Sequence, residues 1–463
     1  MAKSITIIGS GPGGYVAAIR ASQLGFSVTV VEKAEIGGIC SNWGCIPTKS
    51  LLKSAEVLNY SKNAAHYGVT IEGSIAPDFG KIIQRSRQIA SQMSKGIEYL
   101  FTKNNINLVK GTASIKDKQT VAVTGNDGID SEITSDYILL ATGARSRSLP
   151  NLPIDGKIII GYREALTLRY LPKTMVVVGS GAIGVEMAYF YASMGTQVTI
   201  VEYMPSIVPL VDQDVSEPLE RSLKKLKVKV YKESEVMSVI TKDQTTVVLV
   251  KSPKGEIEIE AEVVLSAVGI ETKLEGLGIA EMGIAVQKGR VVVDSHYKTT
   301  VDSVYAIGDI IATPALAHVA SAEALACVEQ LAGHAPKAIN YNAIPSCIYT
   351  SPEIAAVGLT EYQVTEKEIP HTIGKFPFSA LGKATAVGAR EGFVKLIFHG
   401  ETHKLLGAQM VGYNVTEMIA EIVVGLNLGA SAHQLLESIH PHPTMSEAIM
   451  EAAAVACGEA VHG

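Results

Sequence analysis

Two cysteines in a glycine-rich segment are the residues of this chain best suited to redox chemistry. Cys40 and Cys45 lie in the segment 37–49, which reads GGICSNWGCIPTK. In a regular α-helix, residues five apart are separated by a rise of about 7.5 Å, which is too long for a disulfide. The glycines and Pro47 favour a distorted turn that would bring the two sulfur atoms together. Since a strained, partly exposed disulfide exchanges readily with thiols, the segment predicts a redox-active pair.

A second stretch with chemical potential is HPHPTMSE at residues 440–447. Dithiol chemistry needs a base, because the thiolate is the nucleophile and a free thiol titrates near pH 8.5. A histidine has the right titration range, and a nearby carboxylate can fix its tautomer. The structural alternative is that Thr444-x-x-Glu447 forms a capping box that opens a helix. The two roles are not exclusive, and both could involve Glu447, although its side chain would hold only one geometry at a time.

Two similar segments predict the elements that position these residues. Residues 5–32 and 175–202 align without a gap at an offset of 170, and each contains a strand, Gly-Ser-Gly-x-x-Gly, a helix and Val-Thr-x-Val-Glu. The glycines permit a tight turn, a close approach of pyrophosphate and close helix–strand packing, and the helix N terminus favours phosphate. Two such motifs at equal spacing are a much stronger signal than one. The predicted dinucleotide-binding residues are Gly9, Gly11, Gly14 and Glu32 at the first site, and Gly179, Gly181, Gly184 and Glu202 at the second.

The end of the second motif predicts a preference for NAD over NADP. A carboxylate at Glu202 can accept hydrogen bonds from a ribose diol but would repel a 2′-phosphate, and the following Tyr-Met-Pro-Ser supplies no cation to hold one. The first motif bears on the cysteines, because the segment 37–49 begins five residues after Glu32. That proximity disfavours the alternative that Cys40 and Cys45 are buried and inert.

The whole chain fits a large globular protein of about three domains, with 463 residues of which 47% are hydrophobic and 19% charged. We expect strands alternating with helices up to about residue 335, a junction at 333–346, and an α+β segment with a strand at 394–398 and helices at 415–426 and 446–456. Net charge is −6 and no basic run stands out, so nucleic acid is not an expected partner.

Targeting and metal signals are also missing from the sequence. No segment approaches the roughly 18 uninterrupted apolar residues that span a bilayer, and no secretory signal is evident. We therefore expect no membrane partner and a cytoplasmic location, or an organelle matrix if a transit peptide has been removed. The five cysteines include no C-x-x-C, so no metal site is expected.

The cysteine segment and the two glycine motifs resemble the pyridine nucleotide–disulfide oxidoreductases, and the resemblance covers essentially the whole chain. It implies an α/β fold with two Rossmann-like domains, one for FAD and one for NAD, and a C-terminal α+β dimerisation domain. The implied boundaries are an FAD-binding domain at 1–145, an NAD-binding domain at 146–268, a central domain that completes the FAD site at 269–338, and an interface domain at 339–463.

The resemblance also implies catalytic roles. Cys40 would exchange with the substrate, and Cys45 would lie nearest the flavin. Lys49 and Glu186 would form an ion pair that orders the nicotinamide side. The histidine directly before Pro-Thr would be the base for the disulfide of the other subunit in a homodimer. That histidine is His442, and Glu447 would orient it. His440 would have a supporting role at most.

Further cofactor contacts follow from the segments Ala141-Thr142-Gly143 and Tyr305-Ala306-Ile307-Gly308-Asp309, which look like additional FAD segments of the family. The implied FAD contacts are Lys49, Thr142, Gly143, Asp309, Ala317 and His318, and Gly269 is implied on the NAD side. The chain departs from the family pattern at Trp43, at Ile270-Glu271-Thr272-Lys273 and at Val319. These departures bear on access to the disulfide and on contacts to NAD, and none removes a catalytic group.

Within the family, HPHPTMSEAI is most similar to members that oxidise protein-bound dihydrolipoyl groups to lipoyl, with hydride passing through FAD to NAD⁺. The implied partners are a lipoylated acyltransferase of 2-oxo acid dehydrogenase complexes or the lipoylated carrier protein of glycine cleavage. Two alternatives stay open. One is an NAD(P)H-dependent enzyme of the same fold, either a reductase of another disulfide or an NADH oxidase, and the other is a non-catalytic nucleotide-binding protein.

Overall fold

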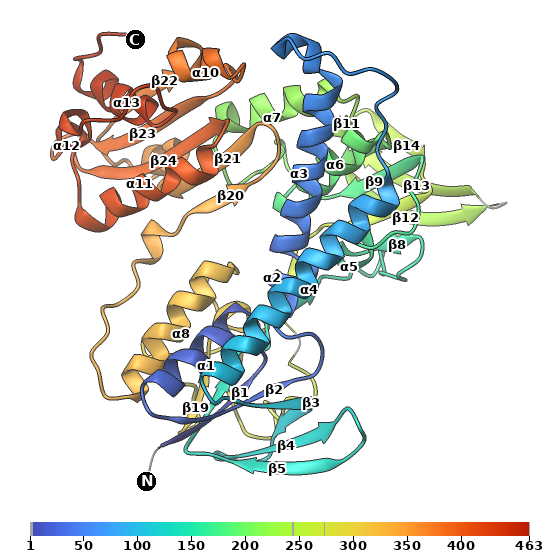
Figure 1. Ribbon diagram of the computed structural model, residues 1–463, viewed down its shortest axis with the longest axis vertical. Coiled ribbons are helices and arrows are strands. Elements are labelled where there is room, and N and C mark those ends of the chain that lie inside the picture. The colour runs from blue at the N-terminus through green and yellow to red at the C-terminus, as the bar shows by residue number, and fades with distance from the viewer. Residues whose placement is uncertain (1–2, 243–244, 273, 463) are drawn as a thin grey trace. The chain divides into compact units, whose positions relative to one another are not determined.

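The computed structural model describes residues 3–242, 245–272 and 274–462 (Figure 1). The chain forms two compact units, each assembled from three segments. The first unit contains Met1–Leu51, Gly80–Arg147 and Gly269–Ile339, and the second contains Leu52–Phe79, Ser148–Val268 and Asn340–Gly463. Among the described residues, no helix combines the length and the apolar character that a membrane span requires.

The first unit is built on a seven-stranded sheet. Its order is β19 (Val304–Ala306), β6 (Tyr137–Leu140), β1 (Ser4–Ile8), β2 (Ser27–Glu32), β3 (Asn107–Ile115), β4 (Thr120–Gly125) and β5 (Asp130–Thr134). The strands from β19 to β3 pair in parallel, and β4 and β5 continue the sheet as an antiparallel meander. Helices α1 (Pro12–Gln23) and α8 (Ala317–Leu331) pack side by side (Figure 1).

The second unit contains a parallel sheet, a small meander and a larger antiparallel sheet. The parallel sheet runs β11 (Lys229–Tyr231), β10 (Gln197–Val201), β9 (Thr174–Val178), β15 (Val263–Ser266) and β8 (Ile159–Ile160), with α6 (Ala182–Met194) and α7 (Gln213–Lys225) among its connections. The meander is β12 (Glu235–Lys242), β13 (Thr245–Ser252) and β14 (Gly255–Glu260).

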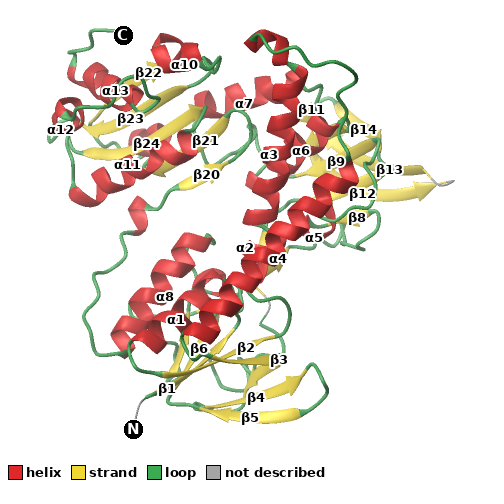
Figure 2. Ribbon diagram, in the orientation of Figure 1, coloured by secondary structure: helices red, strands yellow, loops and turns green. Residues whose placement is uncertain are grey.

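The predicted base, His442, belongs to the part of the second unit that contains an antiparallel sheet near the C terminus. Its order is β20 (Ser346–Ile348), β21 (Glu353–Gly358), β24 (Leu405–Gly412), β23 (Phe393–His399) and β22 (His371–Pro377). Helix α11 (Val415–Leu428) packs on β21 and β24, and α13 (Glu447–Cys457) packs on β22 and β23 (Figure 2). The shorter helices α9 (Glu361–Glu366), α10 (Gly382–Ala386) and α12 (Ala432–Glu437) complete this part.

The repeat forms the same strand–helix–strand unit twice, at the predicted positions. Strands β1 and β9 and helices α1 and α6 begin 170 residues apart, and each motif strand pairs in parallel with its neighbours. The predicted α/β fold class with an α+β C-terminal part is confirmed. The expected alternation of strand and helix is wrong for 107–134 and 235–260, which form antiparallel meanders. Their strands bury alternate residues, as in β4, which is the pattern of a half-exposed antiparallel sheet.

A buried lysine in the second unit holds a cluster of carboxylates. Lys395 of β23 has a side chain that is 1% exposed, and its Nζ lies 2.9 Å from Asp212, 2.7 Å from Asp214 and 3.0 Å from Glu361. Asp212 also accepts a hydrogen bond from Gln409 at 2.7 Å. Burial raises the pKa of Asp214, but hydrogen bonds from its two lysine partners outweigh that effect, so the pKa of this carboxyl is below its usual value.

We expect Lys395→Met to lower the free energy of unfolding of the second unit by about 3–5 kcal/mol, because it removes the buried cation that three carboxylates share. Lys375→Met is the matched control, since Lys375 contacts the same Asp214 at 2.7 Å from a half-exposed position. Lys375→Met should lower the free energy of unfolding by less than about 1 kcal/mol.

The measurement is urea unfolding of both variants at several pH values. The Lys395 effect should shrink as the pH falls through the carboxylate range, because a carboxyl with a lowered pKa loses its contribution there. Equal effects of the two variants would contradict this account.

Candidate active site

The cysteine segment is a helix interrupted between the two cysteines. Helix α2 (Gly38–Trp43) ends at Gly44, and α3 (Cys45–Lys62) begins at Cys45. Cys40 therefore lies inside one short helix and Cys45 opens the next. The predicted distortion between them is present, and both cysteines are in the thiol form, with Cys40 half-buried and Cys45 exposed.

The two thiols are hydrogen-bonded, and this contact makes them unequal. The hydrogen bond to Cys45 and burial raise the pKa of Cys40 far above that of an ordinary thiol, and the positive charge of Lys49 offsets only part of this. Lys49 lies one turn beyond Cys45 in α3. Within the pair, Cys40 therefore holds its proton more tightly than an ordinary thiol does.

The segment packs directly on the first glycine motif. A Cβ built on Gly38 would lie 2.7 Å from the Cα of Gly11, so only glycine fits at this position. Gly37 and Gly38 have φ values of +92° and +61°, which other residues rarely adopt. The cysteine pair is thereby held beside the turn that would bind the first dinucleotide.

Helix α4 (Phe79–Lys103) braces the segment through contacts that the sequence analysis missed. The amide of Asn42 donates to the carbonyl of Ile36 at 2.9 Å, and its oxygen accepts a hydrogen bond from Ser94 of α4 at 2.9 Å. Arg87 of α4 stacks over Trp43, with its guanidinium carbon 4.3 Å from the ring centroid. The unusual Trp43 is therefore held by α4. Arg87 and Ser94 are far from the cysteine segment in sequence, so no local pattern identified them.

Both glycine motifs share a serine–glutamate contact that was also missed. Ser10 donates to Glu32 from its hydroxyl at 2.7 Å and from its backbone N–H at 2.9 Å. Ser180 makes the same two bonds to Glu202 at 2.6 and 2.7 Å. The signal was present in the sequence, because this serine occupies the same position in both repeats. It fixes the carboxylate orientation at each site.

The glycines of the motifs have the geometry that a dinucleotide turn needs. Gly9 and Gly179 have φ values of +101° and +93°. A Cβ on Gly14 or Gly184 would lie 1.9 or 2.1 Å from the carbonyl oxygen of the first glycine, so helix and strand pack as closely as expected.

The other predicted FAD residues belong to the same first unit, and their environment fits a polar cofactor. The hydroxyl of Thr142 is buried and has no hydrogen-bond partner among the residues that the structure describes. Asp309 is half-buried, and burial raises its pKa while Arg290 opposes the shift. The neighbouring Gly308 donates its N–H to Glu323 of α8 at 2.7 Å. An unsatisfied hydroxyl and a braced acidic turn beside the glycine motif are what the ribityl and phosphate groups of FAD would use.

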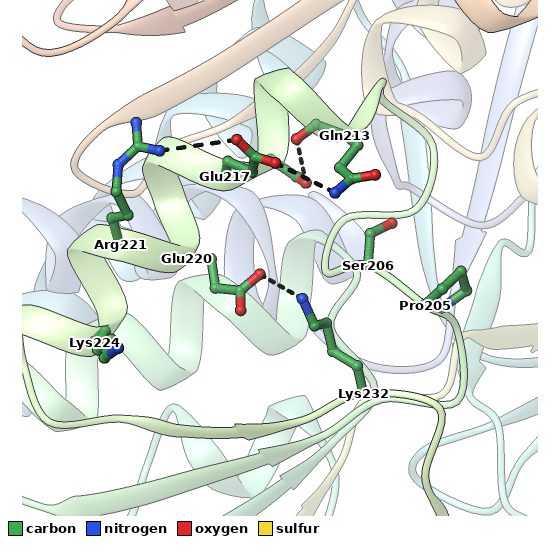
Figure 3. A pocket seen from close by; sticks show the side chains of 9 residues that line it. Pro205, Ser206, Gln213, Glu217, Glu220, Arg221, Lys224 and Lys232 are labelled. Carbon is green, nitrogen blue, oxygen red and sulfur yellow. Dashed lines mark hydrogen bonds and ion pairs between the residues drawn. The ribbon is translucent and has the colours of Figure 1, made fainter. Parts of the chain in front are cut away.

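The second unit contains a cavity of about 340 Å³ (Figure 3). The cavity lies between the loop after Glu202 and helix α7. Its wall includes cations that the local sequence did not reveal, but Lys232 pairs with Glu220 at 3.0 Å and Arg221 approaches Glu217 at 3.9 Å. The lining residues are Pro205, Ser206, Gln213, Ser216, Glu217, Glu220, Arg221, Lys224 and Lys232. The paired cations Lys232 and Arg221 are therefore compatible with the predicted preference for NAD.

Glu186 is buried in α6, and its carboxylate accepts a hydrogen bond from the backbone N–H of Tyr349 at 3.0 Å. This buried carboxylate therefore has a polar partner in its own unit. Lys49 belongs to the first unit and Glu186 to the second. Their ion pair stays a prediction.

His442 and Glu447 form the predicted pair. Nδ1 of His442 lies 2.8 Å from Oε1 of Glu447, and Oε2 of the same carboxylate accepts the N–H of Thr444 at 2.8 Å. Burial opposes ionisation of Glu447, but the hydrogen bonds from Thr444 and His442 keep the pKa of this carboxyl below its usual value. A carboxylate therefore fixes the histidine tautomer with Nε2 pointing away from it, as a proton acceptor requires.

Glu447 serves the start of the helix and the histidine in a single geometry, because each of its two oxygens has its own partner. The capping box itself is only half formed. Helix α13 begins at Glu447 after Ser446, and the hydroxyl of Thr444 donates to the carbonyl of Pro441 at 2.8 Å instead of accepting a helix N–H.

The structure sorts the predicted residues into two groups. The first unit contains Cys40, Cys45, Lys49, Gly9, Gly11, Gly14, Glu32, Thr142, Gly143, Gly269, Asp309, Ala317 and His318. The second contains Gly179, Gly181, Gly184, Glu186, Glu202, His440, His442 and Glu447. Of the departures from the family pattern, Ile270–Thr272 forms strand β16 against β7 (Ala144–Ser146), Val319 is buried in α8, and Lys273 lies outside the described residues.

Comparisons with known proteins agree with this arrangement. Residues 3–324 match the family described as pyridine nucleotide-disulphide oxidoreductase, and residues 344–453 match the dimerisation domain of that family. The chain is 41% identical to dihydrolipoyl dehydrogenase of Rhizobium etli, with 99% of this chain and 98% of the relative covered. It is 39% identical to the mitochondrial dihydrolipoyl dehydrogenase of Pisum sativum, with 99% and 92% covered.

Solved structures show the same fold. LpdA from Mycobacterium tuberculosis superposes with a TM-score of 0.91 at 27% identity, covering 97% of this chain and 99% of that one. The HOCl-induced flavoprotein disulfide reductase RclA from Escherichia coli superposes with a TM-score of 0.85 at 25% identity, covering 96% and 98%. The chain therefore belongs to the pyridine nucleotide–disulphide oxidoreductase family, whose cofactors are FAD and NAD.

Proposed function

We propose that the chain is a dihydrolipoyl dehydrogenase, which oxidises the dihydrolipoyl group of a lipoylated protein to lipoyl and transfers the electrons through FAD to NAD⁺. The observation that carries the proposal is the hydrogen-bonded pair Cys40 and Cys45, held against the first glycine motif by Gly38. The full-length relatives named dihydrolipoyl dehydrogenase support the choice of substrate.

The thiol exchange follows from the unequal cysteines. In the oxidised enzyme, a dihydrolipoyl thiolate attacks the sulfur of Cys40, and the Cys40–Cys45 bond breaks with Cys45 leaving as a thiolate. The second thiol of the substrate then attacks the substrate sulfur bound to Cys40, which closes the lipoyl ring and leaves Cys40 reduced. The hydrogen bond from Cys40 would stabilise the thiolate that forms at Cys45. FAD, when bound, supplies the two-electron chemistry that links the dithiol to NAD⁺.

His442 supplies the proton transfer that this exchange needs. Its Nε2 accepts the proton of the attacking substrate thiol, while Glu447 holds the ring through Nδ1. In this proposal the histidine serves the cysteine pair of the partner subunit, and the working unit is a homodimer. The matched dimerisation domain at 344–453 supports that arrangement.

The glycine motifs would hold the two cofactors. In our proposal FAD contacts Gly9, Gly11, Gly14, Glu32, Thr142, Gly143, Asp309, Ala317 and His318, and NAD contacts Gly179, Gly181, Gly184, Glu202 and Gly269. Lys49 and Glu186 would pair beside the nicotinamide. We retain the division into an FAD-binding domain, an NAD-binding domain, a central domain and an interface domain at 1–145, 146–268, 269–338 and 339–463.

The proposed physiological partner is a lipoylated acyltransferase of a 2-oxo acid dehydrogenase complex or the lipoylated carrier of glycine cleavage. The proposed location is the cytoplasm or an organelle matrix, and the bacterial and mitochondrial relatives support this range.

The test is a spectrophotometric assay of the purified flavoprotein with free dihydrolipoamide. NADH should form with NAD⁺ and far more slowly with NADP⁺, because Glu202 is buried and fixed by Ser180 where a 2′-phosphate would lie. Glutathione disulfide with NADH is the parallel assay. Faster reduction of glutathione disulfide than oxidation of dihydrolipoamide would favour the alternative reductase. Colourless protein without either activity would favour the non-catalytic alternative.

A further inference from the structure

The segment that carries His442 is a loop, 438–446, which we call the base loop. It connects α12 to α13, and much of it is solvent-exposed, with Ile439 97% exposed and the His442 side chain 75% exposed. Met445 is buried in the core and anchors its C-terminal end. A general base must be placed within hydrogen-bonding reach of its proton, so the N-terminal half of this loop also needs an anchor.

His440 is buried where its neighbours in the loop are not. Its side chain is 6% exposed, and both ring nitrogens lie 2.8 Å from acceptor atoms. Nδ1 faces the carbonyl oxygen of Ser438, and Nε2 faces Oε1 of Glu421 on α11. A neutral imidazole has only one N–H, so a ring that serves two acceptors carries both protons and is positively charged.

The positive charge on His440 lies close to the pair formed by His442 and Glu447. The charged groups that face it are Glu421 and Glu447, and the hydrogen bond to Glu421 raises the pKa of His440 against the effect of burial. Glu447 is in turn the carboxylate that holds Nδ1 of His442. A cation at His440 therefore lies beside the carboxylate that orients the base, as well as in contact with Glu421.

We propose that His440 is a positioning residue for His442: it ties the base loop to α11 through Glu421 and presents a positive charge to Glu447. This inference rests on the proposed role of His442 as the base of the thiol exchange. It adds a second histidine with a different task, whose two ring nitrogens are both held by acceptor atoms.

Two substitutions separate the tether from the charge. His440→Asn places an amide N–H near the position of Nδ1, which keeps the contact inside the loop but loses Glu421. His440→Gln places an amide N–H near the position of Nε2, which keeps the contact to Glu421 without the charge. The measurements are kcat and kcat/KM for dihydrolipoamide oxidation by the full-length holoenzyme between pH 6 and 9, with NADH-to-dye activity as the reference.

We expect His440→Asn to lower kcat with dihydrolipoamide by about 10- to 100-fold, the effect of a misplaced catalytic group, while NADH-to-dye activity stays unchanged. His440→Gln should keep a near-wild-type kcat, because the contact to Glu421 is retained. His462→Asn is the matched control, because His462 pairs with Glu451 of α13 at 2.8 Å. It should behave as the wild type.

Three results would overturn the inference. They are a wild-type kcat in His440→Asn, an equal loss of NADH-to-dye activity in that variant, and a maximum in His440→Gln as low as that in His440→Asn. Gel filtration of each variant identifies any loss that comes from dissociation of the dimer, and such a loss would also count against a positioning role. An inactive wild type would contradict the proposed function instead, so the two failures can be told apart.

Discussion

Cys45→Ser should lower dihydrolipoamide oxidation by a factor of about 10⁴ or more, because the covalent exchange cannot proceed without the second sulfur. The same variant should keep NADH-to-dye activity, since the electrons then move from NADH through the flavin to the dye without using the cysteine pair. The measurement is the two steady-state assays on one preparation, with the visible flavin spectrum as a check of cofactor content.

Cys457→Ser is the control for this prediction. Cys457 is half-buried at the end of α13 and has no role in the proposed exchange. Its substitution should leave both activities near the wild-type values. Substantial dihydrolipoamide turnover by Cys45→Ser would show that another group completes the exchange and would remove the basis of the proposed mechanism.

His442→Gln should lower the rate of the thiol half-reaction by about 10²- to 10⁴-fold, which is the usual contribution of a general base. The chemical reason is that Nε2 of His442 accepts the proton of the attacking thiol, whereas reoxidation by NAD⁺ does not involve that proton. Rapid-mixing measurements of reduction by dihydrolipoamide and of reoxidation by NAD⁺ follow the two half-reactions separately. Equal slowing of both would contradict the base role.

The chain offers a closely matched control in His462→Gln. Nδ1 of His462 lies 2.8 Å from Oε1 of Glu451 on α13, and the His462 side chain is 69% exposed, so its pair has nearly the same chemistry as that of His442. His462→Gln should leave both half-reactions unchanged. A comparable effect would indicate that the loss in His442→Gln comes from a disturbed helix.

The framework of the protein could be predicted because it depends on local patterns that occur twice. The glycine motifs fix a strand, a turn and a helix within about 28 residues, and the equal spacing of 5–32 and 175–202 made each copy support the other. The break between Cys40 and Cys45 was likewise predicted from spacing and helix geometry alone. The two meanders were missed because alternating burial in a short strand resembles the pattern of many other segments.

The parts that were not predicted depend on contacts between residues far apart in sequence. The carboxylates around Lys395 come from α7 and α9, and only the fold brings them to a lysine in β23. The contact of Glu421 with His440 connects α11 to a loop 19 residues later. The sequence could not show that the two oxygens of Glu447 face two different partners, His442 and Thr444.

The most direct test of the central claim, that the two cysteines have unequal roles, is the visible spectrum of two single-cysteine variants of the holoenzyme. The account places the thiolate at Cys45, beside the flavin, and exchange with substrate at Cys40. Purified Cys40→Ser should therefore show a long-wavelength thiolate–flavin absorption that rises with pH, and Cys45→Ser should show none. The opposite result, with the absorption only in Cys45→Ser, would contradict the assignment of the two sulfurs.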